Sequence, residues 1–265
     1  MSRPRFETSV VAKNARKRSP YWGEHVARYL FALPYVANHC TLDIACGDGY
    51  GLPLIQKSAR GVVGVDISFQ AAQNARSELG KGPGQVVVAD GRRLPFADHS
   101  FEAVTSFETL EHLEDRTQFL SELARVLTPK GICILSTPNA NYTLPVNGKP
   151  KNPYHVHEYT PEDLETELSG YFAKTTMLGE SLDRRFVIPP FWDEQERLSK
   201  QSGMRKQILF WRVLNKVPSA TVRDHVSRTV WGHPFLPSED DYQFSESTVD
   251  NAPVLVAICH KAAAA

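Results

Sequence analysis

Between residues 40 and 140, short apolar runs alternate with segments of helical periodicity. The apolar runs are rich in Val and Ile and read "TLDIAC", "GVVGVDI", "QVVVAD", "EAVTSFE" and "GICILST". Runs that are apolar on both faces are typical of strands covered by helices on both sides of a sheet. A strand and helix rhythm of this kind predicts an α/β fold with a doubly wound, Rossmann-like parallel sheet.

After residue 140 this rhythm breaks. A Pro-, Asn- and Gly-rich loop precedes a well-capped helix at "TPEDLETELSGYF", and "AKTTMLGES" and "VLVAICHK" predict two final strands. Between those strands we expect a helical insertion over 184–247, with helices near 193–201, 204–215 and 220–231. The predicted organisation is a flexible basic N-terminus (1–20), a core (21–183 and 248–261, opening with an amphipathic helix), the insertion (184–247) as a substrate-binding lid, and a tail (262–265).

Charge and cysteine content set the expected cellular context. Thirty Lys and Arg residues balance thirty Asp and Glu residues, so the chain as a whole has no pull toward nucleic acid or an anionic membrane. The four cysteines show no CxxC spacing, which favours reduced thiols in a cytoplasmic protein. No window approaches the ~20 apolar residues of a membrane span, and no signal peptide is evident, so we expect no membrane insertion.

The stretch "LDIACGDGYG" carries the strongest chemical signal. A buried strand leads into Gly47, Gly49 and Gly51, and a helical pattern follows. Such glycines allow a sharp turn and close approach of the backbone to a ligand. The next residue is Leu52, so the dinucleotide pattern GxGxxG is incomplete. An acid within the strand, Asp43, suits a cationic ligand better than a pyrophosphate.

Two more acids end the following strands. Asp66 closes "VVGVD", where a carboxylate can accept the protons of both ribose hydroxyls. Asp90 closes "VVVAD" and precedes Gly91, at the place where an adenine edge would lie. Each acid alone is typical of a surface loop, but acids at three successive strand ends indicate a ligand site, because open α/β sheets bind ligands there.

Together these stretches resemble the class I S-adenosylmethionine-dependent methyltransferases, with "ELARVLTPKGICILSTPN" as a further match. The resemblance implies a seven-stranded sheet with an antiparallel last strand. It also implies that Asp43 and the glycines hold the methionine part, Asp66 the ribose, and Asp90 with Gly91 the adenine. The predicted cofactor residues are Asp43, Ala45, Gly47, Gly49, Gly51, Asp66, Ile67, Asp90, Gly91 and Glu108. Ala45, Lys130 and Glu102 depart from common residues of the family without disqualifying it.

The stretch "SFETLEHLED" follows the fourth strand. In a helical turn Glu108, Glu111 and His112 would share one face, being three and four residues apart. Acids in the first turn of a helix are also stabilised by its dipole, which is the ordinary explanation. The position at a strand end, where a methyl acceptor must meet the cofactor, favours a functional interpretation.

The pattern ExxEH with a later histidine also resembles ubiquinone-pathway O-methyltransferases and small-RNA 3′-terminal 2′-O-methyltransferases. In the latter, two glutamates and two histidines bind a divalent metal, which here implies Glu108, Glu111, His112 and His155, the last from "HVHEYT". Mg²⁺ or Mn²⁺ chelated by a vicinal diol would activate one hydroxyl. Without a metal, His112 would act as general base, oriented by Glu111.

The acceptor signal is softer. "NPYHVHEYTPEDL" resembles bacterial sugar and polysaccharide O-methyltransferases, and residues 184–235 hold ten Lys and Arg against four Asp and Glu. No RNA-binding module is visible, which disfavours nucleic acid. We predict a metal-assisted O-methyltransferase acting on a sugar or oligosaccharide hydroxyl. Catechol or quinone-type acceptors, an RNA ribose, a non-catalytic cofactor-binding scaffold and an NAD-dependent oxidoreductase remain alternatives. Candidate substrate residues are Tyr21, Trp22, His157, Tyr159, Trp192 and Trp211.

Overall fold

The computed structural model describes residues 21–80, 82–200 and 203–262, and these form two compact units. The first unit comprises residues 28–181 and 244–262, and the second comprises residues 21–27 and 182–243. The N-terminal segment predicted to be flexible (1–20) and residues 263–265 of the predicted tail lie outside the described residues. Each unit is considered by itself.

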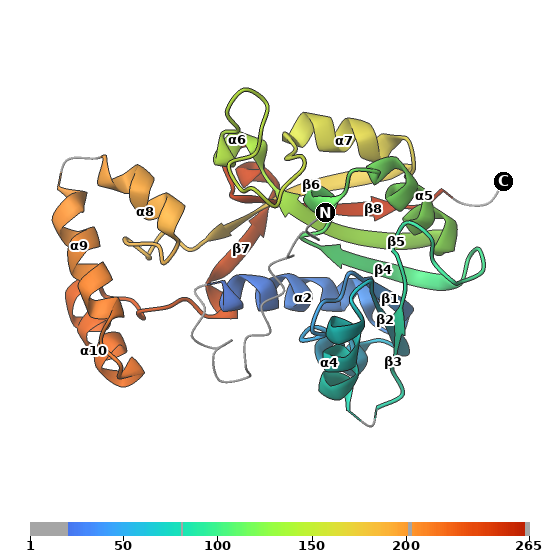
Figure 1. Ribbon diagram of the computed structural model, residues 1–265, viewed down its shortest axis with the longest axis horizontal. Helices are drawn as coiled ribbons and strands as arrows, with labels where there is room; N and C mark the ends of the chain where they lie inside the picture. The colour runs from blue at the N-terminus through green and yellow to red at the C-terminus, as the bar shows by residue number, and fades with distance from the viewer. Residues whose placement is uncertain (1–20, 81, 201–202, 263–265) are drawn as a thin grey trace, which may run out of the picture. The chain divides into compact units, whose positions relative to one another are not determined.

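The sheet has eight strands in the order β3-β2-β1-β4-β5-β8-β6-β7 (Figure 1). The strands are β1 (Cys40–Ile44), β2 (Gly61–Asp66), β3 (Gln85–Val88), β4 (Phe101–Phe107), β5 (Leu127–Pro138), β6 (Lys174–Leu182), β7 (Tyr242–Ser245) and β8 (Val254–His260). Strands β1 to β5 pair in parallel, whereas β8 is antiparallel to both β5 and β6. The doubly wound sheet with an antiparallel last strand is confirmed. The expected count of seven strands is exceeded by β7, a short strand at the edge.

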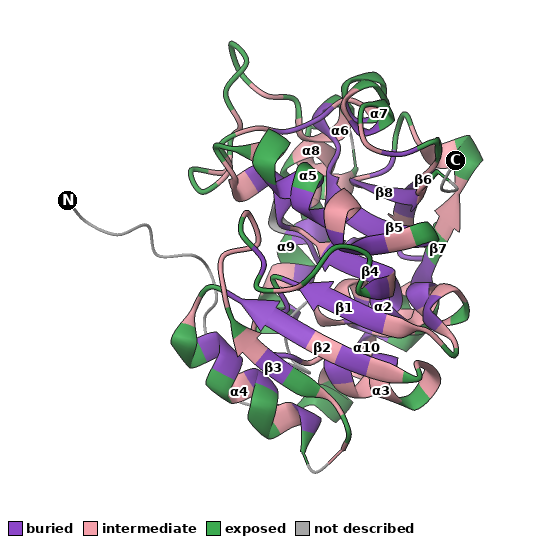
Figure 2. Cartoon of the chain, turned by 90° about the vertical axis from the view of Figure 1, so that its right-hand side faces the viewer, coloured by how far each residue is buried: buried purple, intermediate pink, exposed green. Residues whose placement is uncertain are grey.

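Helices cover both faces of this sheet. One face packs against α2 (Trp22–Val36), α3 (Leu52–Ser58) and α4 (Phe69–Leu79), and the other packs against α5 (Arg116–Val126) and α7 (Pro161–Ser169). Alternate strand residues serve alternate faces: Ile132 and Ile134 of β5 join the first core, while Cys133 and Leu135 join the second. The central strands β1, β2, β4, β5 and β8 are therefore buried along most of their length (Figure 2), which explains why they are apolar in both directions.

Short elements connect the parallel strands to the rest of the first unit. They are α6 (Ala140–Thr143) and the 3-10 turns η1 (Leu110–His112) and η3 (Glu246–Thr248). Helix α7 begins as its sequence predicts, because the Thr160 hydroxyl accepts from the Asp163 amide and Pro161 occupies the first position. In a parallel sheet the loops after β1, β2, β3, β4 and β5 emerge at one edge, and the candidate residues follow these strands.

The second unit is helical. It contains α8 (Trp192–Ser199), α9 (Met204–Asn215), α10 (Ala220–Trp231) and the 3-10 turn η2 (Glu239–Asp241), close to the helices expected for the insertion. Its core consists of Ile188, Ile208, Trp211, Leu214 and Phe235. Within the described part of the chain, no helix is long and apolar enough to span a membrane.

Candidate active site

The glycine loop after β1 is built from three residues in the left-handed region. Ala45, Gly47 and Gly49 have φ values of 56°, 54° and 76°. Gly47 faces open space, since an added Cβ would meet no atom within 4 Å, which leaves room for a ligand. Gly49 and Gly51 instead face protein, because their Cβ atoms would lie 2.4 Å from the Cα of Ala75 and 2.1 Å from the ring of Tyr29. The loop is thus open at its first glycine and tightly packed at the other two.

Asp66 lies at the end of β2 beside this loop. Its Oδ2 accepts from the Gly47 amide at 2.9 Å, and its Oδ1 accepts from the Ser68 amide at 2.8 Å. Burial raises the pKa of Asp66, and these two backbone hydrogen bonds act in the opposite direction. Each oxygen keeps a second lone pair, so the carboxylate could still accept from ribose hydroxyls. Ile67, which follows it, is 58% exposed.

Asp43 is placed differently from what we expected of a residue that holds the methionine part. It is 1% exposed, and both of its oxygens accept hydrogen bonds from hydroxyls: Oδ1 from Thr105 at 2.6 Å and Oδ2 from Tyr29 at 3.0 Å. Burial raises its pKa to about 7, although both hydrogen bonds lower it. In this arrangement Asp43 can act on a bound cation through its charge rather than by direct contact.

Asp90 and Gly91 follow β3. Asp90 forms a two-oxygen ion pair with Arg92, and hydrogen bonds from that guanidinium hold the pKa of Asp90 below its usual value. An added Cβ at Gly91 would lie 2.7 Å from the ring of Phe119. The acids at the ends of β1, β2 and β3 therefore have distinct environments: Asp43 is buried, Asp66 accepts from backbone amides and Asp90 is paired with Arg92.

The expected helical face of Glu108, Glu111 and His112 is wrong. Glu108 has a φ of 50° and lies outside η1, the single 3-10 turn that contains Glu111 and His112. Its Oε1 accepts from the Ser136 hydroxyl at 2.8 Å and lies 3.6 Å from the guanidinium of Arg28. The left-handed backbone at Glu108 breaks the helical periodicity, so the i, i+3 spacing no longer places its carboxylate with the other two side chains.

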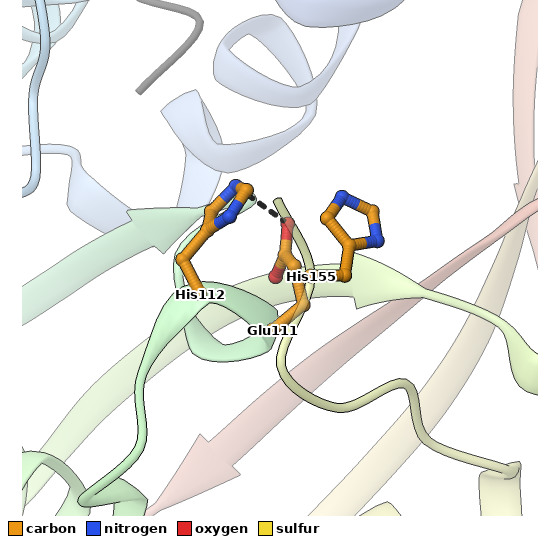
Figure 3. A group of neighbouring side chains, drawn as sticks. All are labelled: Glu111, His112 and His155. Atoms are coloured by element: carbon orange, nitrogen blue, oxygen red, sulfur yellow. Dashed lines mark ion pairs between the residues drawn. The ribbon is translucent and has the colours of Figure 1, made fainter. Parts of the chain in front are cut away.

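Glu111 and His112 do meet His155. One ligand atom from each of these three side chains lies within 4.8 Å of the others, a grouping that could hold a metal ion (Figure 3). Glu111 is 1% exposed; its Oε2 accepts from the Thr137 hydroxyl at 3.0 Å, and its Oε1 lies 3.7 Å from His112 Nε2. Burial, and next the charge of Glu108, raise the pKa of Glu111 well above its usual value.

Neighbouring acceptors fix the ring orientation of both histidines. Nδ1 of His112 lies 2.9 Å from the carbonyl oxygen of Tyr154, so Nδ1 carries the proton and Nε2 is the basic nitrogen. Nδ1 of His155 lies 2.6 Å from Oε1 of Glu158, and its Nε2 lies 2.9 Å from the side-chain amide of Asn152. Burial alone would raise the pKa of Glu158, but hydrogen bonds from His155 and Thr143 hold it below the usual value.

Sequence reasoning missed two residues of α2 near these loops. Arg28 is 1% exposed and pairs with Glu180 of β6 at 2.5 Å, in addition to its contact with Glu108. Tyr29 is 3% exposed and bonds Asp43. The signal available in the sequence is an arginine that interrupts the apolar face formed by Val26, Ala27 and Tyr29, and that signal does not identify the partners.

The candidate substrate residues do not share one environment. Trp211 is 4% exposed and stacks on Phe235, so it serves the core of the second unit instead of presenting a face to a sugar. Tyr159 is 1% exposed and donates to Glu167, whereas His157 is partly buried against the Tyr159 ring. Tyr21 is 46% exposed, with its ring centroid 5.1 Å from that of Phe191. Trp22 begins α2 and is partly buried, and the side chain of Trp192 lies outside the described residues.

Comparisons with known proteins agree with this architecture. Residues 42–135 match the methyltransferase domain family. A probable S-adenosylmethionine-dependent methyltransferase of Mycobacterium tuberculosis is 35% identical over 161 residues, covering 60% of this chain and 58% of that protein. A methyltransferase of Streptomyces halstedii is 35% identical over 115 residues, covering 41% of each chain. The chain thus spans less than two thirds of these curated relatives.

Solved structures show the same fold. The YcgJ protein of Bacillus subtilis superposes with a TM-score of 0.57 at 19% identity, covering 91% of this chain and all of that one. An S-adenosylmethionine-dependent methyltransferase of Archaeoglobus fulgidus gives 0.55 at 20% identity, covering 90% and 94%. Residues 42–135 thus match the methyltransferase domain family, and the sheet built around them has the fold of solved S-adenosylmethionine-dependent methyltransferases.

Proposed function

We propose that this protein is an S-adenosylmethionine-dependent O-methyltransferase, assisted by a divalent metal, that acts on a hydroxyl of a sugar or oligosaccharide. The observation that supports this proposal most directly is the grouping of Glu111, His112 and His155 at the end of β4. It lies on the same edge of the sheet as the loops that follow β1 and β2, where class I enzymes hold the cofactor.

The cofactor side of the proposal rests on the glycine loop. When bound, S-adenosylmethionine supplies an electrophilic methyl group on a positively charged sulfur. The open space at Gly47 would admit the ligand, and the Asp66 carboxylate would accept from its ribose hydroxyls. The buried charge of Asp43 would stabilise the cationic methionine part through space.

The donor set suits Mg²⁺, Mn²⁺ or another first-row metal, because it combines a carboxylate with two imidazoles. The carboxylate–histidine pair of Glu158 and His155 is typical of the outer shell that orients a metal-bound histidine. A bound metal would supply Lewis acidity that lowers the pKa of a chelated hydroxyl. Glu108, the fourth expected ligand, accepts from Ser136 and faces Arg28, so binding there requires a rearranged side chain.

His112 is the residue we assign to proton transfer when no metal occupies its Nε2. Its Nε2 is the basic nitrogen, and the Tyr154 carbonyl holds the ring in that tautomer. S-adenosylmethionine would supply the methyl group, and the acceptor hydroxyl would lose its proton as its oxygen is methylated. With a metal on Nε2 of His112, the Glu111 carboxylate would accept that proton; without a metal, Nε2 of His112 would accept it. Glu111, at 3.7 Å, would stabilise the resulting imidazolium.

A metal-free mechanism is the second candidate, and one contact favours it. The Nε2 of His155 already accepts from the Asn152 amide at 2.9 Å, so a metal would have to displace that hydrogen bond. In this mechanism His112 alone serves as the general base, oriented by Tyr154 and Glu111, and His155 supports the loop.

Chelation distinguishes the two mechanisms. We expect methyl transfer to stop in excess chelator and to recover with Mg²⁺ or Mn²⁺, with His155→Ala abolishing that recovery. His225→Ala, on exposed helix α10 of the second unit, is the matched control and should respond to metal like the wild type. Full activity in excess chelator would exclude the metal-assisted mechanism and support the metal-free mechanism with His112 as general base.

The acceptor needs its own assay. Sugars present vicinal hydroxyls that a metal could chelate, and the basic excess of residues 184–235 would suit a phosphorylated or otherwise anionic sugar. We would measure transfer of a labelled methyl group to mono- and oligosaccharides, catechols and small RNAs. Labelling of a catechol or an RNA alone would replace the sugar assignment. Cofactor binding with no transfer to any of them would indicate a scaffold protein.

A further inference from the structure

Tyr29 of α2 makes contacts of two kinds with the loop region after β1. Its ring forms edge-on contacts with Tyr50 and Phe107, with centroids 5.4 and 5.0 Å apart. Its hydroxyl donates to the buried carboxylate of Asp43 at 3.0 Å. One side chain therefore joins the N-terminal helix to the strand end and to the glycine loop.

The Tyr29 ring also restricts position 51 of the glycine loop to a residue without a side chain. A Cβ added to Gly51 would lie 2.1 Å from two carbons of the Tyr29 ring, much closer than any non-bonded contact allows. Gly51 is the N-cap residue of α3, so its backbone sets the direction in which the helix leaves the loop. At Gly49 the loop is confined by Ala75 of α4 in the same way. The loop backbone is thus held between α2 and α4.

The hydroxyl has an electrostatic role. Asp43 is buried, and burial opposes its ionisation; the hydroxyls of Tyr29 and Thr105 donate to the charged form and favour it. The titratable groups that face Asp43 are Tyr29 from α2, Cys46 and Tyr50 from the loop, and Asp66 from β2. The charge of Asp66 further opposes ionisation of Asp43. The two hydroxyl donors are therefore what counteracts burial.

We propose that Tyr29 is a positioning residue for the cofactor: its ring fixes the glycine loop, and its hydroxyl keeps Asp43 ionised to face a cationic ligand. The role of the Tyr29 hydroxyl rests on the proposed function, because it requires a cationic cofactor. The role of the Tyr29 ring concerns the glycine loop itself and can be tested without a cofactor.

The ring is tested by a double-mutant cycle of unfolding free energies. Gly51→Ala should be strongly destabilising in the wild-type background and much less so in Tyr29→Ala, because the ring that the new methyl group would meet has been removed. Gly51→Ala in Tyr29→Phe should remain as harmful as in the wild type, since the ring is still present. Equal effects of Gly51→Ala in all three backgrounds would overturn the role of the ring.

The hydroxyl is tested by S-adenosylmethionine affinity, measured by calorimetry from pH 6 to 9. Tyr29→Phe keeps the ring and should weaken binding by about fivefold at pH 7, with recovery toward pH 9, because Asp43 then ionises about one pH unit higher. Thr105→Val should shift the same profile in the same direction. Tyr35→Phe, on the same helix, is the matched control and should leave it unchanged.

The outcomes separate this inference from the proposed function. A Tyr29→Phe profile that superimposes on the wild-type profile would overturn the electrostatic role while cofactor binding stands. A wild-type protein that binds no S-adenosylmethionine at any pH would overturn the proposed function and, with it, the role of the hydroxyl. The double-mutant cycle would still decide the role of the ring.

Discussion

The glycine loop and the acid–histidine group lie at the same edge of one sheet but are built in different ways. The loop is one contiguous stretch whose glycines mark its left-handed backbone in the local sequence, and Asp66, Tyr29 and Ala75 contact it from other elements. The acid–histidine group joins η1 to a loop that follows β5, and the Val156 amide donates to the Glu111 carbonyl at 2.7 Å to hold the two together. Local patterns thus specify the first region, and tertiary contacts assemble the second.

The strongest test of this division uses one variant in each region. Glu111→Gln should lower methyl transfer by about a thousandfold, in the range expected when proton transfer or its support is lost. Its cofactor affinity should stay near the wild-type value, because Glu111 contacts Thr137 and His112 rather than the glycine loop. Asp66→Ala should instead lower the affinity for the cofactor. Turnover and calorimetric titration measure the two effects.

Exposed Glu165 of α7 supplies the control, since Glu165→Gln should change neither quantity. If Glu111→Gln weakened cofactor binding as much as it slowed transfer, the two regions would have to be treated as one site.

Packing of the loop predicts the next largest effect. Gly51→Ala should reduce the free energy of unfolding by about 3 kcal/mol, since its methyl group would meet the Tyr29 ring. Gly61→Ala, where an added Cβ meets no atom within 4 Å, should be nearly neutral. Chemical denaturation measures both variants, and comparable losses would show that the clash is relieved elsewhere.

We expect ionisation of Asp43 to lower the free energy of unfolding and to strengthen binding of the cationic cofactor. Its folded-state pKa of about 7 exceeds the usual 3.8, so the folded protein binds this proton more tightly, and ionisation removes stability as pH rises between those values. Asp43→Asn should therefore raise the unfolding free energy by about 4 kcal/mol at pH 8.5 and by about 2 kcal/mol at pH 5.5. It should also weaken binding of the cationic cofactor.

Unfolding curves at both pH values measure this effect. Asp98→Asn is a contrasting control, because the hydrogen bond from Arg125 holds the pKa of exposed Asp98 below its usual value. Its pH dependence should have the opposite sign. A gain for Asp43→Asn that is the same at pH 5.5 and 8.5 would mean that charge is not the cause.

The smallest expected effect lies at the first residue of the loop. Ala45 has a φ of 56°, which an L-residue adopts at a cost of about 1–2 kcal/mol and glycine adopts freely. After allowing for the greater chain entropy of glycine, Ala45→Gly should stabilise the protein by about 0.5–1 kcal/mol. Ala59→Gly, at a φ of −74°, should destabilise it slightly. Thermal unfolding of both variants would check the sign.

Much of the fold could be read from the sequence, because its signals are local. The apolar runs predicted the strands of the doubly wound sheet, and the helical periods predicted α9 and α10 at their observed bounds. The antiparallel last strand was implied by the family resemblance. Strand β7 was missed since four residues of mixed polarity give no periodic signal. The α-helical turn expected at Glu108 was wrong because that residue adopts a left-handed backbone.

The sequence by itself determined the glycine loop, the acids at three strand ends and the match to the methyltransferase domain family, since each rests on short stretches of the chain. Only the tertiary structure decided which side chains meet. It buried Asp43 under Tyr29 and Thr105, drew Glu108 to Ser136 and Arg28, and brought His155 to Glu111. These contacts join residues 14 to 80 positions apart, and no spacing rule within one helix or strand reaches that far.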